Sequence, residues 1–308
     1  MKSNGQISQG KDNRRTLTDA YGRIPYNMTN DYMFRAVLQT NNKVLKTLIA
    51  ALLHLDESDI RSVQITNPIV LGASIELKEI RLDVSVLLNN DMLINLEMQV
   101  ANKLNWNNRS VLYLCRTFDQ LNHGEGYNKA HPAIHIGFLD YTLFDKCPEF
   151  YATYKLMNVK KNHIYSDNLT LSVVDLTHIE LATEEDRKYH IDSWAKLFKA
   201  TTWEEIKVLA SKDENICEAA NTIFQLSADE QMRKWCRDRE EYYQDIRNYE
   251  RVIAEKDADL LKKDAVIIDA IAEKESAVAK ANALFAETER LRALLKEHGI
   301  IKSYPDKP

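Results

Sequence analysis

Asp83 and Glu97 are the two residues whose types and positions most directly suggest chemistry. They lie in residues 80–88 and 92–100, where apolar side chains at even positions alternate with mostly polar ones at odd positions. An alternation with period two predicts a β-strand with one apolar and one polar face. Two carboxylates side by side on a sheet face repel each other unless a cation lies between them. A divalent cation such as Mg²⁺ or Mn²⁺ takes oxygen ligands and suits such a pair, whereas a solvated face with ordinary acidic residues is the alternative.

The hydrophobic pattern also predicts how the two strands pair. Residues 89–91, Asn-Asn-Asp, are predicted to form a three-residue loop. If Leu88 pairs with Met92 across this loop, every even position pairs apolar with apolar, and Asp83 lies directly opposite Glu97. A two-residue loop would shift the register by one residue and place the carboxylates on opposite faces. We therefore predict that Asp83 and Glu97 are neighbours on one face, with Cβ atoms roughly 5 Å apart.

The same residues carry a resemblance to a nuclease signature. Asp83, followed after thirteen residues by Glu97-Met98-Gln99, resembles the PD-(D/E)XK motif, with Gln99 where a lysine usually stands. More narrowly, the chain resembles the recombination-promoting nuclease and transposase (Rpn-like) family of bacteria over roughly residues 29–225. The segments that carry this resemblance are NDYMFRAVL from Asn30, RLDVSV, NLEMQV, RSVLYLCRTFDQLNHGEGY and HPAIHIGFLDY. The resemblance implies a restriction-endonuclease-like α/β fold with an αβββαβ core.

The resemblance also implies roles for individual residues. Asp83 and Glu97 would bind Mg²⁺ or Mn²⁺, helped by the backbone carbonyl of Met98, in an endonuclease that hydrolyses phosphodiester bonds of DNA. Gln99 would orient the attacking water or a phosphate oxygen, although glutamine cannot act as a general acid or base at neutral pH. Asp31 either helps to complete the metal site or interacts with the dipole of the helix that it begins.

Three further residues are candidates for contacts with the substrate. Arg109 lies in a predicted helix over residues 105–121, where the family motif also has an arginine. It would approach the scissile phosphate or orient Glu97 or Gln99, and a surface arginine with a packed stem is the alternative. Tyr113 lies one helical turn further, and Arg81 shares the polar strand face with Asp83. The side chains predicted to point inward from this helix are those of Trp106, Val111, Leu114, Cys115 and Phe118.

The remaining elements of a nuclease-like domain over residues 29–182 follow from periodicity and turn residues. A helix is predicted from Thr29 or Asn30 to about residue 52, with a break near residues 41–42. Further strands are predicted at 62–71, 133–141, 151–159 and 169–176. His131 and His135 alternate with apolar residues, which favours hydrogen-bonded sheet histidines over metal ligands.

The C-terminal third is predicted to be helical, because it contains no glycine between residues 137 and 299 and no proline between 148 and 305. The predicted segments are a polar arm (1–28), a helical extension (183–227), a long helix (228–298) and a tail (299–308). Ser227-Ala-Asp-Glu resembles a capping box that begins the long helix.

Isoleucine and leucine recur every seven residues in the long helix, as in a coiled-coil seam, at Ile246, Ile253, Leu260 and Ile267. Lys256 and Lys263 occupy positions where a second apolar row is expected. A weak coiled coil, a helix folded back on the domain and a stable dimer therefore remain alternatives, and homo-oligomerisation through this helix is expected to be weak.

Composition limits the function classes. The chain has 308 residues, 44% of them hydrophobic, and a net charge of −5, so DNA binding would depend on a local basic face or on metal ions. The four cysteines form no CxxC pair, and no apolar stretch of about 18 residues occurs, which favours a reduced cytoplasm and no membrane span. Recombination, mobile-element transposition and phage defence all fit a DNA endonuclease. The alternative is a catalytically silent nuclease-fold module that binds DNA or recruits partners through the coiled coil.

Overall fold

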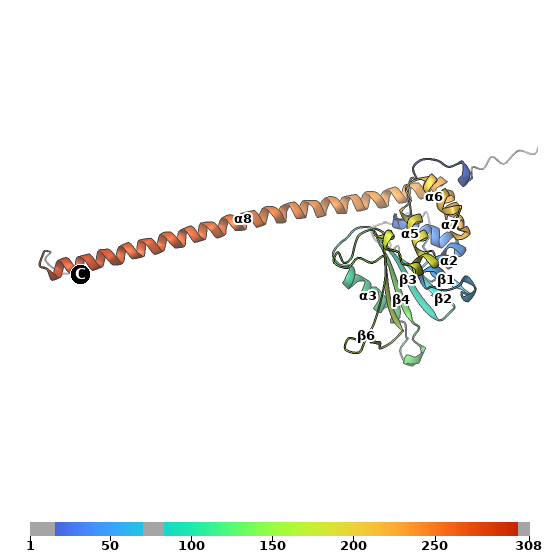
Figure 1. Cartoon of the computed structure of the whole chain (residues 1–308), viewed down its shortest axis with the longest axis horizontal. Helices are drawn as coiled ribbons and strands as arrows, with labels where there is room; N and C mark the ends of the chain where they lie inside the picture. The colour runs from blue at the N-terminus through green and yellow to red at the C-terminus, as the bar shows by residue number, and fades with distance from the viewer. Residues whose placement is uncertain (1–15, 70–82, 301–308) are drawn as a thin grey trace, which may run out of the picture. The chain divides into compact units, whose positions relative to one another are not determined.

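The computed structural model describes residues 16–69 and 83–300. The chain divides into two compact units, Met1–Gln244 and Asp245–Pro308 (Figure 1). The first unit contains a mixed α/β domain, and the second consists of the greater part of one long helix.

Among the described residues, the main sheet of the first unit has the strand order β1-β2-β3-β4-β8-β5. Its strands are β1 (Val63–Ile65), β2 (Val84–Leu88), β3 (Met92–Gln99), β4 (Ala133–Leu139), β8 (Leu169–Asp175) and β5 (Tyr151–Lys155). A separate pair is formed by β6 (Met157–Asn158) and β7 (His163–Ile164). The pairs β3–β4 and β4–β8 are parallel, and the other pairs of the main sheet are antiparallel. The element order confirms the predicted αβββαβ core.

The β2–β3 hairpin has the predicted register. Val84 pairs with Leu96 and Leu88 pairs with Met92. The loop between them contains Asn89 and Asn90 at φ 52° and 64°, a left-handed conformation that asparagine tolerates better than most residues. Asp83 directly precedes β2, and extension of this register by one residue beyond the Val84–Leu96 pair places it opposite Glu97. The predicted strand segments within residues 70–82 lie outside the described residues.

The even-numbered face of the hairpin packs into the main hydrophobic core. This core includes side chains from α1 (Asp31–Thr40), α2 (Asn42–Leu52), α5 (Ile191–Lys199) and α7 (Glu214–Ala228). The rings of Phe34, Phe138 and Phe198 meet there, with centroids 5.2 to 5.8 Å apart. The break predicted near residues 41–42 is confirmed, because the side chain of Asn41 accepts from the backbone of the first turn of α2.

The opposite, odd-numbered face is covered by α3 (Trp106–Phe118), which lies on the other side of the sheet from α1 and α2 (Figure 1). Trp106 packs on Gly137 of β4 so closely that a Cβ there would lie 2.1 Å from its ring. Trp106, Ser110 and Leu114 are the buried residues of α3. The prediction that Val111 and Cys115 point inward is wrong. Each follows a buried residue of α3 by one position, which is a rotation of about 100° around the helix, and both side chains are exposed.

The helical extension and the long helix form as predicted, but with a different cap. The remaining helices are α4 (Glu184–Lys188), α6 (Trp203–Ala210) and α8 (Glu230–Glu297), and short 3₁₀ turns occur at Leu17–Asp19, Glu57–Asp59, Tyr127–Lys129 and Ile179–Leu181. Ser227 belongs to the last turn of α7, and Asp229 caps α8 by accepting from the backbone N–H of Met232 at 2.8 Å. The capping role predicted for Ser227 is therefore wrong.

In the second unit, the seam residues Ile253, Leu260 and Ile267 of α8 are exposed. Self-association through them stays a prediction. Among the described residues, no helix is both long and apolar enough to span a membrane.

Candidate active site

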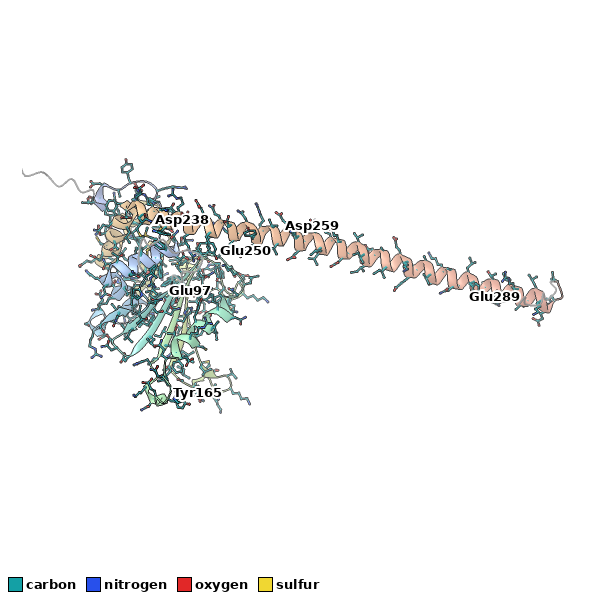
Figure 2. All side chains as sticks on the ribbon, turned by 180° about the vertical axis from the view of Figure 1, so that it is seen from behind. Glu97, Tyr165, Asp238, Glu250, Asp259 and Glu289 are labelled. Carbon is teal, nitrogen blue, oxygen red and sulfur yellow. The ribbon has the colours of Figure 1, made fainter. Side chains whose placement is uncertain are left out.

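Glu97 is a buried residue of β3, labelled in Figure 2. Its side chain is 5% exposed, and its Oε1 accepts from Nε of Arg109 at 2.8 Å and from Nη2 at 2.6 Å. Burial raises the pKa of Glu97, Arg109 lowers it, and the charges of Asp83 and Asp31 raise it further. Asp31, Asp83 and Glu97, the three acidic residues predicted from the sequence, therefore lie close enough for the charges of the first two to act on Glu97.

Asp83 is held through its backbone. Its carbonyl accepts from Nη1 of Arg35 and, at 3.0 Å, from Nδ2 of Asn67. Arg35 comes from α1 and is fully buried, and burial lowers its pKa to about 10, partly offset by the charge of Asp83. Sequence reasoning missed Arg35, although an arginine between Phe34 and Ala36 on a buried helix signals a specific partner.

Asp31 is bound by two residues of α8. Arg239 donates from Nη2 to Oδ2 at 2.7 Å and from Nε to Oδ1 at 2.9 Å, and the hydroxyl of Tyr243 donates to Oδ2 at 2.6 Å. The Asp31 and Arg239 side chains are 5% and 10% exposed. Sequence reasoning missed Arg239 and Tyr243, which are more than 200 residues away from Asp31.

The rest of the motif lies along β3. Gln99 is buried on the same face as Glu97, and its Nε2 donates to the carbonyl of Ala101 at 2.9 Å. The carbonyl of Gln99 accepts from the N–H of Asp140, so the carbonyl of Met98 points to the other side, towards β2. Arg81 lies outside the described residues.

Tyr113 and Arg109 form a cation–π pair, with the guanidinium carbon 4.8 Å from the ring centroid. Tyr113 also lines a polar cavity of about 180 Å³ together with Asp83, Asn95 and Arg116. Of the two carboxylate residues, Asp83 lines this cavity.

His135 of β4 lies beneath Glu97 and is fully buried. Its Nδ1 lies 3.0 Å from Nδ2 of Asn95, and its Nε2 lies 3.7 Å from Oε2 of Glu97. Burial, with the charge of Arg109 acting in the same direction, lowers the pKa of His135 to about 3, so the ring is neutral at ordinary pH. The prediction of hydrogen-bonded sheet histidines is wrong for Nε2 of His135, which has no hydrogen-bond partner among the described residues. His131 contacts the carbonyl of Asp91 through Nδ1.

Tyr141 is a further residue near the carboxylates that sequence reasoning missed. Burial raises its pKa to about 12, with the charge of Glu97 acting in the same direction. The hydroxyl of Tyr141 is therefore neutral at ordinary pH.

The donor set fits a divalent cation with two protein carboxylates. Oε2 of Glu97 is buried without a hydrogen-bond partner among the described residues, and Asp83 lies on the same face. Within the described part of the chain, no group of three or more His, Cys, Asp or Glu side chains is arranged to hold a metal. Mg²⁺ commonly keeps several waters and takes only one or two carboxylates from the protein, so a two-carboxylate site suits it.

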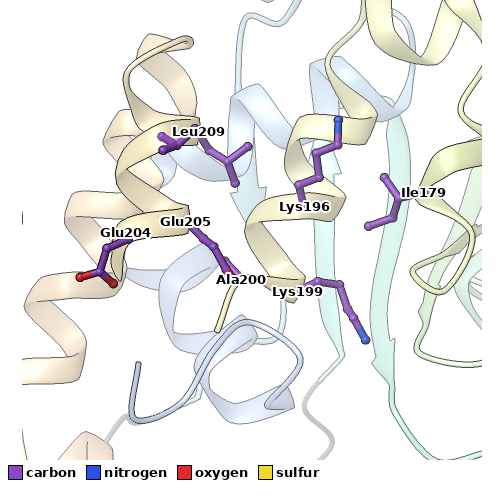
Figure 3. A pocket seen from close by; sticks show the side chains of 8 residues that line it. Ile179, Lys196, Lys199, Ala200, Glu204, Glu205 and Leu209 are labelled. Carbon is purple, nitrogen blue, oxygen red and sulfur yellow. The ribbon is translucent and has the colours of Figure 1, made fainter. Parts of the chain in front are cut away.

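A larger cavity of about 600 Å³ lies elsewhere in the first unit (Figure 3). Its charged side chains already have partners: Lys196 contacts Asp192, Lys199 contacts Asp140, and Glu204 accepts from the backbone of Gly22. Among the described residues, none of those predicted to do chemistry lines this cavity.

The αβββαβ core, with Asp83 just before its second strand and Glu97 on its third, is consistent with the restriction-endonuclease-like fold. A family model described as PD-(D/E)XK nuclease family transposase matches residues 28–252, and the chain belongs to this family. The match includes the start of α8, and with it Arg239 and Tyr243. No curated protein and no solved structure shows significant similarity to the chain.

Proposed function

We propose that the protein is a metal-dependent DNA endonuclease of the PD-(D/E)XK type. The observation that carries this proposal is the Asp83–Glu97 pair on one sheet face, with a buried Glu97 oxygen that has no hydrogen-bond partner among the described residues. Asp83 and Glu97, with the carbonyl of Met98, would hold Mg²⁺ or Mn²⁺. The bound cation would lower the pKa of a water and stabilise negative charge on the phosphate.

The surrounding residues of the chain hold this pair in place. Arg109 fixes one oxygen of Glu97, which supports an orienting role for it rather than a purely surface one. Arg35 fixes the backbone of Asp83 from the opposite side of the sheet. Gln99 would orient the water or a phosphate oxygen as a neutral donor, because it cannot carry the charge of the usual lysine. Asp31 would contribute negative charge near the pair rather than a further metal ligand, because Arg239 and Tyr243 already bind its carboxylate.

The proposed substrate is DNA in the cytoplasm, and the proposed role is recombination or mobile-element transposition, as the description of the family supports. A net charge of −5 gives no general attraction to DNA, so binding would depend on the metal and on local cations. Arg116 and Tyr113, at the cavity beside Asp83, supply such a contact surface.

A catalytically silent DNA-binding or interaction module is the second proposal. Arginines compensate the charges of both Glu97 and Asp31, so neither carboxylate depends on a metal for stability. Calorimetric titration with Mg²⁺ and Mn²⁺ distinguishes the two proposals. An endonuclease binds one of these cations and loses this binding in Glu97→Gln, whereas an absence of binding by the parent protein favours the silent module.

A further inference from the structure

Three buried polar atoms on the face beneath α3 have no hydrogen-bond partner among the described residues: Oε2 of Glu97, Nε2 of His135 and Nε1 of Trp106. Cross-strand pairing brings them together, because Asn95 and Glu97 of β3 face His135 and Gly137 of β4. The indole carbon next to Nε1 lies 3.3 Å from the Cβ position of Gly137, the partner of Glu97. Buried polar atoms are rarely left unpaired, so this cluster calls for an explanation.

Asn95 determines which nitrogen of His135 carries the proton. Its Nδ2 is an amide donor and lies 3.0 Å from Nδ1 of His135, while its Oδ1 accepts from Oγ of Ser85 at 3.4 Å. Because the Asn95 amide can only donate to Nδ1, Nδ1 is the unprotonated acceptor, and the ring proton of the neutral histidine lies on Nε2. The N–H group at Nε2 therefore faces the free oxygen of Glu97 at 3.7 Å.

This tautomer excludes His135 as a metal ligand in the present arrangement. A ligating histidine nitrogen has to be unprotonated, and its other nitrogen usually donates to a carbonyl or carboxylate. His135 shows the reverse pattern, with an amide donor behind Nδ1 and a proton towards the site.

We propose that His135 is a positioning residue for Glu97, whose Nε2–H group fixes the second carboxylate oxygen while Arg109 fixes the first. The separation of 3.7 Å closes to hydrogen-bond distance by a small rotation of the Glu97 carboxylate. A carboxylate oxygen has two lone pairs, so Oε2 can accept from His135 and still face a cation. The consequence for metal binding rests on the proposed function, whereas the tautomer and its contact with Glu97 do not.

The first test needs no metal and no activity. In protein with ¹⁵N-labelled histidine, the resonances of His135 are assigned by their loss in His135→Gln. The parent is expected to show the neutral tautomer with the proton on Nε2, and Glu97→Gln is expected to move that proton resonance upfield. A proton on Nδ1, or a resonance that Glu97→Gln leaves unchanged, overturns the proposal even in a protein that cuts DNA.

The second test measures the Mg²⁺ concentration at which thermal stabilisation is half complete. Loss of a partner that orients a metal ligand typically weakens binding 10- to 100-fold, so His135→Leu is expected to raise the midpoint about tenfold. His135→Gln keeps an N–H donor and is expected to restore most of the affinity. Equal midpoints for the two variants contradict the positioning role. If the parent shows no metal-induced stabilisation while the spectroscopic result holds, the proposed function fails and the contact of His135 with Glu97 stands.

Discussion

Removal of Arg239 is expected to destabilise the nuclease domain strongly, although this arginine belongs to the long C-terminal helix. Arg239 donates to both oxygens of Asp31 at 2.7 to 2.9 Å, and the two side chains are 10% and 5% exposed. When one partner of a buried ion pair is removed, the other charge is left uncompensated, at a cost of about 3–5 kcal/mol. In a unit of this size, 1 kcal/mol lowers the melting temperature by about 2–4 °C. Arg239→Met is therefore expected to melt about 6–20 °C below the parent.

Circular dichroism melts of four proteins test this expectation: the parent, Arg239→Met, Arg237→Met and the double variant Asp31→Asn/Arg239→Met. Arg237 lies on the same helix with an exposed side chain, so its substitution controls for helix propensity and should shift the melting temperature by less than about 2 °C. The double variant removes the unpaired charge and should recover much of the loss.

Two results would refute this reasoning. A melting temperature of Arg239→Met within about 2 °C of the parent would show that Asp31 does not depend on α8. A double variant less stable than Arg239→Met alone would show that the cost comes from lost packing rather than from an uncompensated carboxylate.

Three further predictions concern the motif, pH and the long helix. Gln99→Lys restores the commoner motif and is expected to keep part of the plasmid-nicking activity, since its ammonium can still reach water or phosphate; complete loss of nicking would contradict this expectation. Burial lowers the pKa of His135 to about 3 from an ordinary value of 6.5, so the unfolded chain binds more protons between these values and stability falls as pH falls through this window. Between pH 6.5 and 4.5, the free energy of unfolding measured in urea should fall less for His135→Gln than for the parent, by up to about 1.4 kcal/mol per pH unit, and equal falls would contradict the lowered pKa of His135. Sedimentation velocity of the full chain against a chain ending at Gln244 is expected to show weak concentration-dependent association only for the full chain, and identical behaviour of the two would reject self-association through the heptad seam.

The carboxylate pair could be predicted from the sequence because a strand periodicity of two leaves little freedom. The even positions of the hairpin are apolar throughout, so a single register buries them all, and that register places Asp83 opposite Glu97. The break between α1 and α2 was equally readable, because Asn41 can both end one helix and cap the next.

Contacts between distant segments could not be predicted in the same way. No local pattern links Asp31 to Arg239, because their ion pair depends on where the start of α8 packs. The buried face of α3 was partly misassigned because the sheet beneath it is polar, so Ser110 is buried and the more hydrophobic Val111 is not. Periodicity arguments assume an apolar partner surface, and that assumption fails next to a site rich in polar side chains.

The most direct test of the central claim pairs plasmid nicking with thermal melting, each with and without Mg²⁺, for the parent and Asp83→Asn. Asp83→Asn keeps the shape of the side chain and removes one of two like charges, so in metal-free buffer the variant should be at least as stable as the parent. With Mg²⁺, the parent is expected to nick supercoiled plasmid and to melt at a higher temperature, and the variant is expected to do neither. If parent and variant nick equally, Asp83 is not part of the active site and the account is wrong.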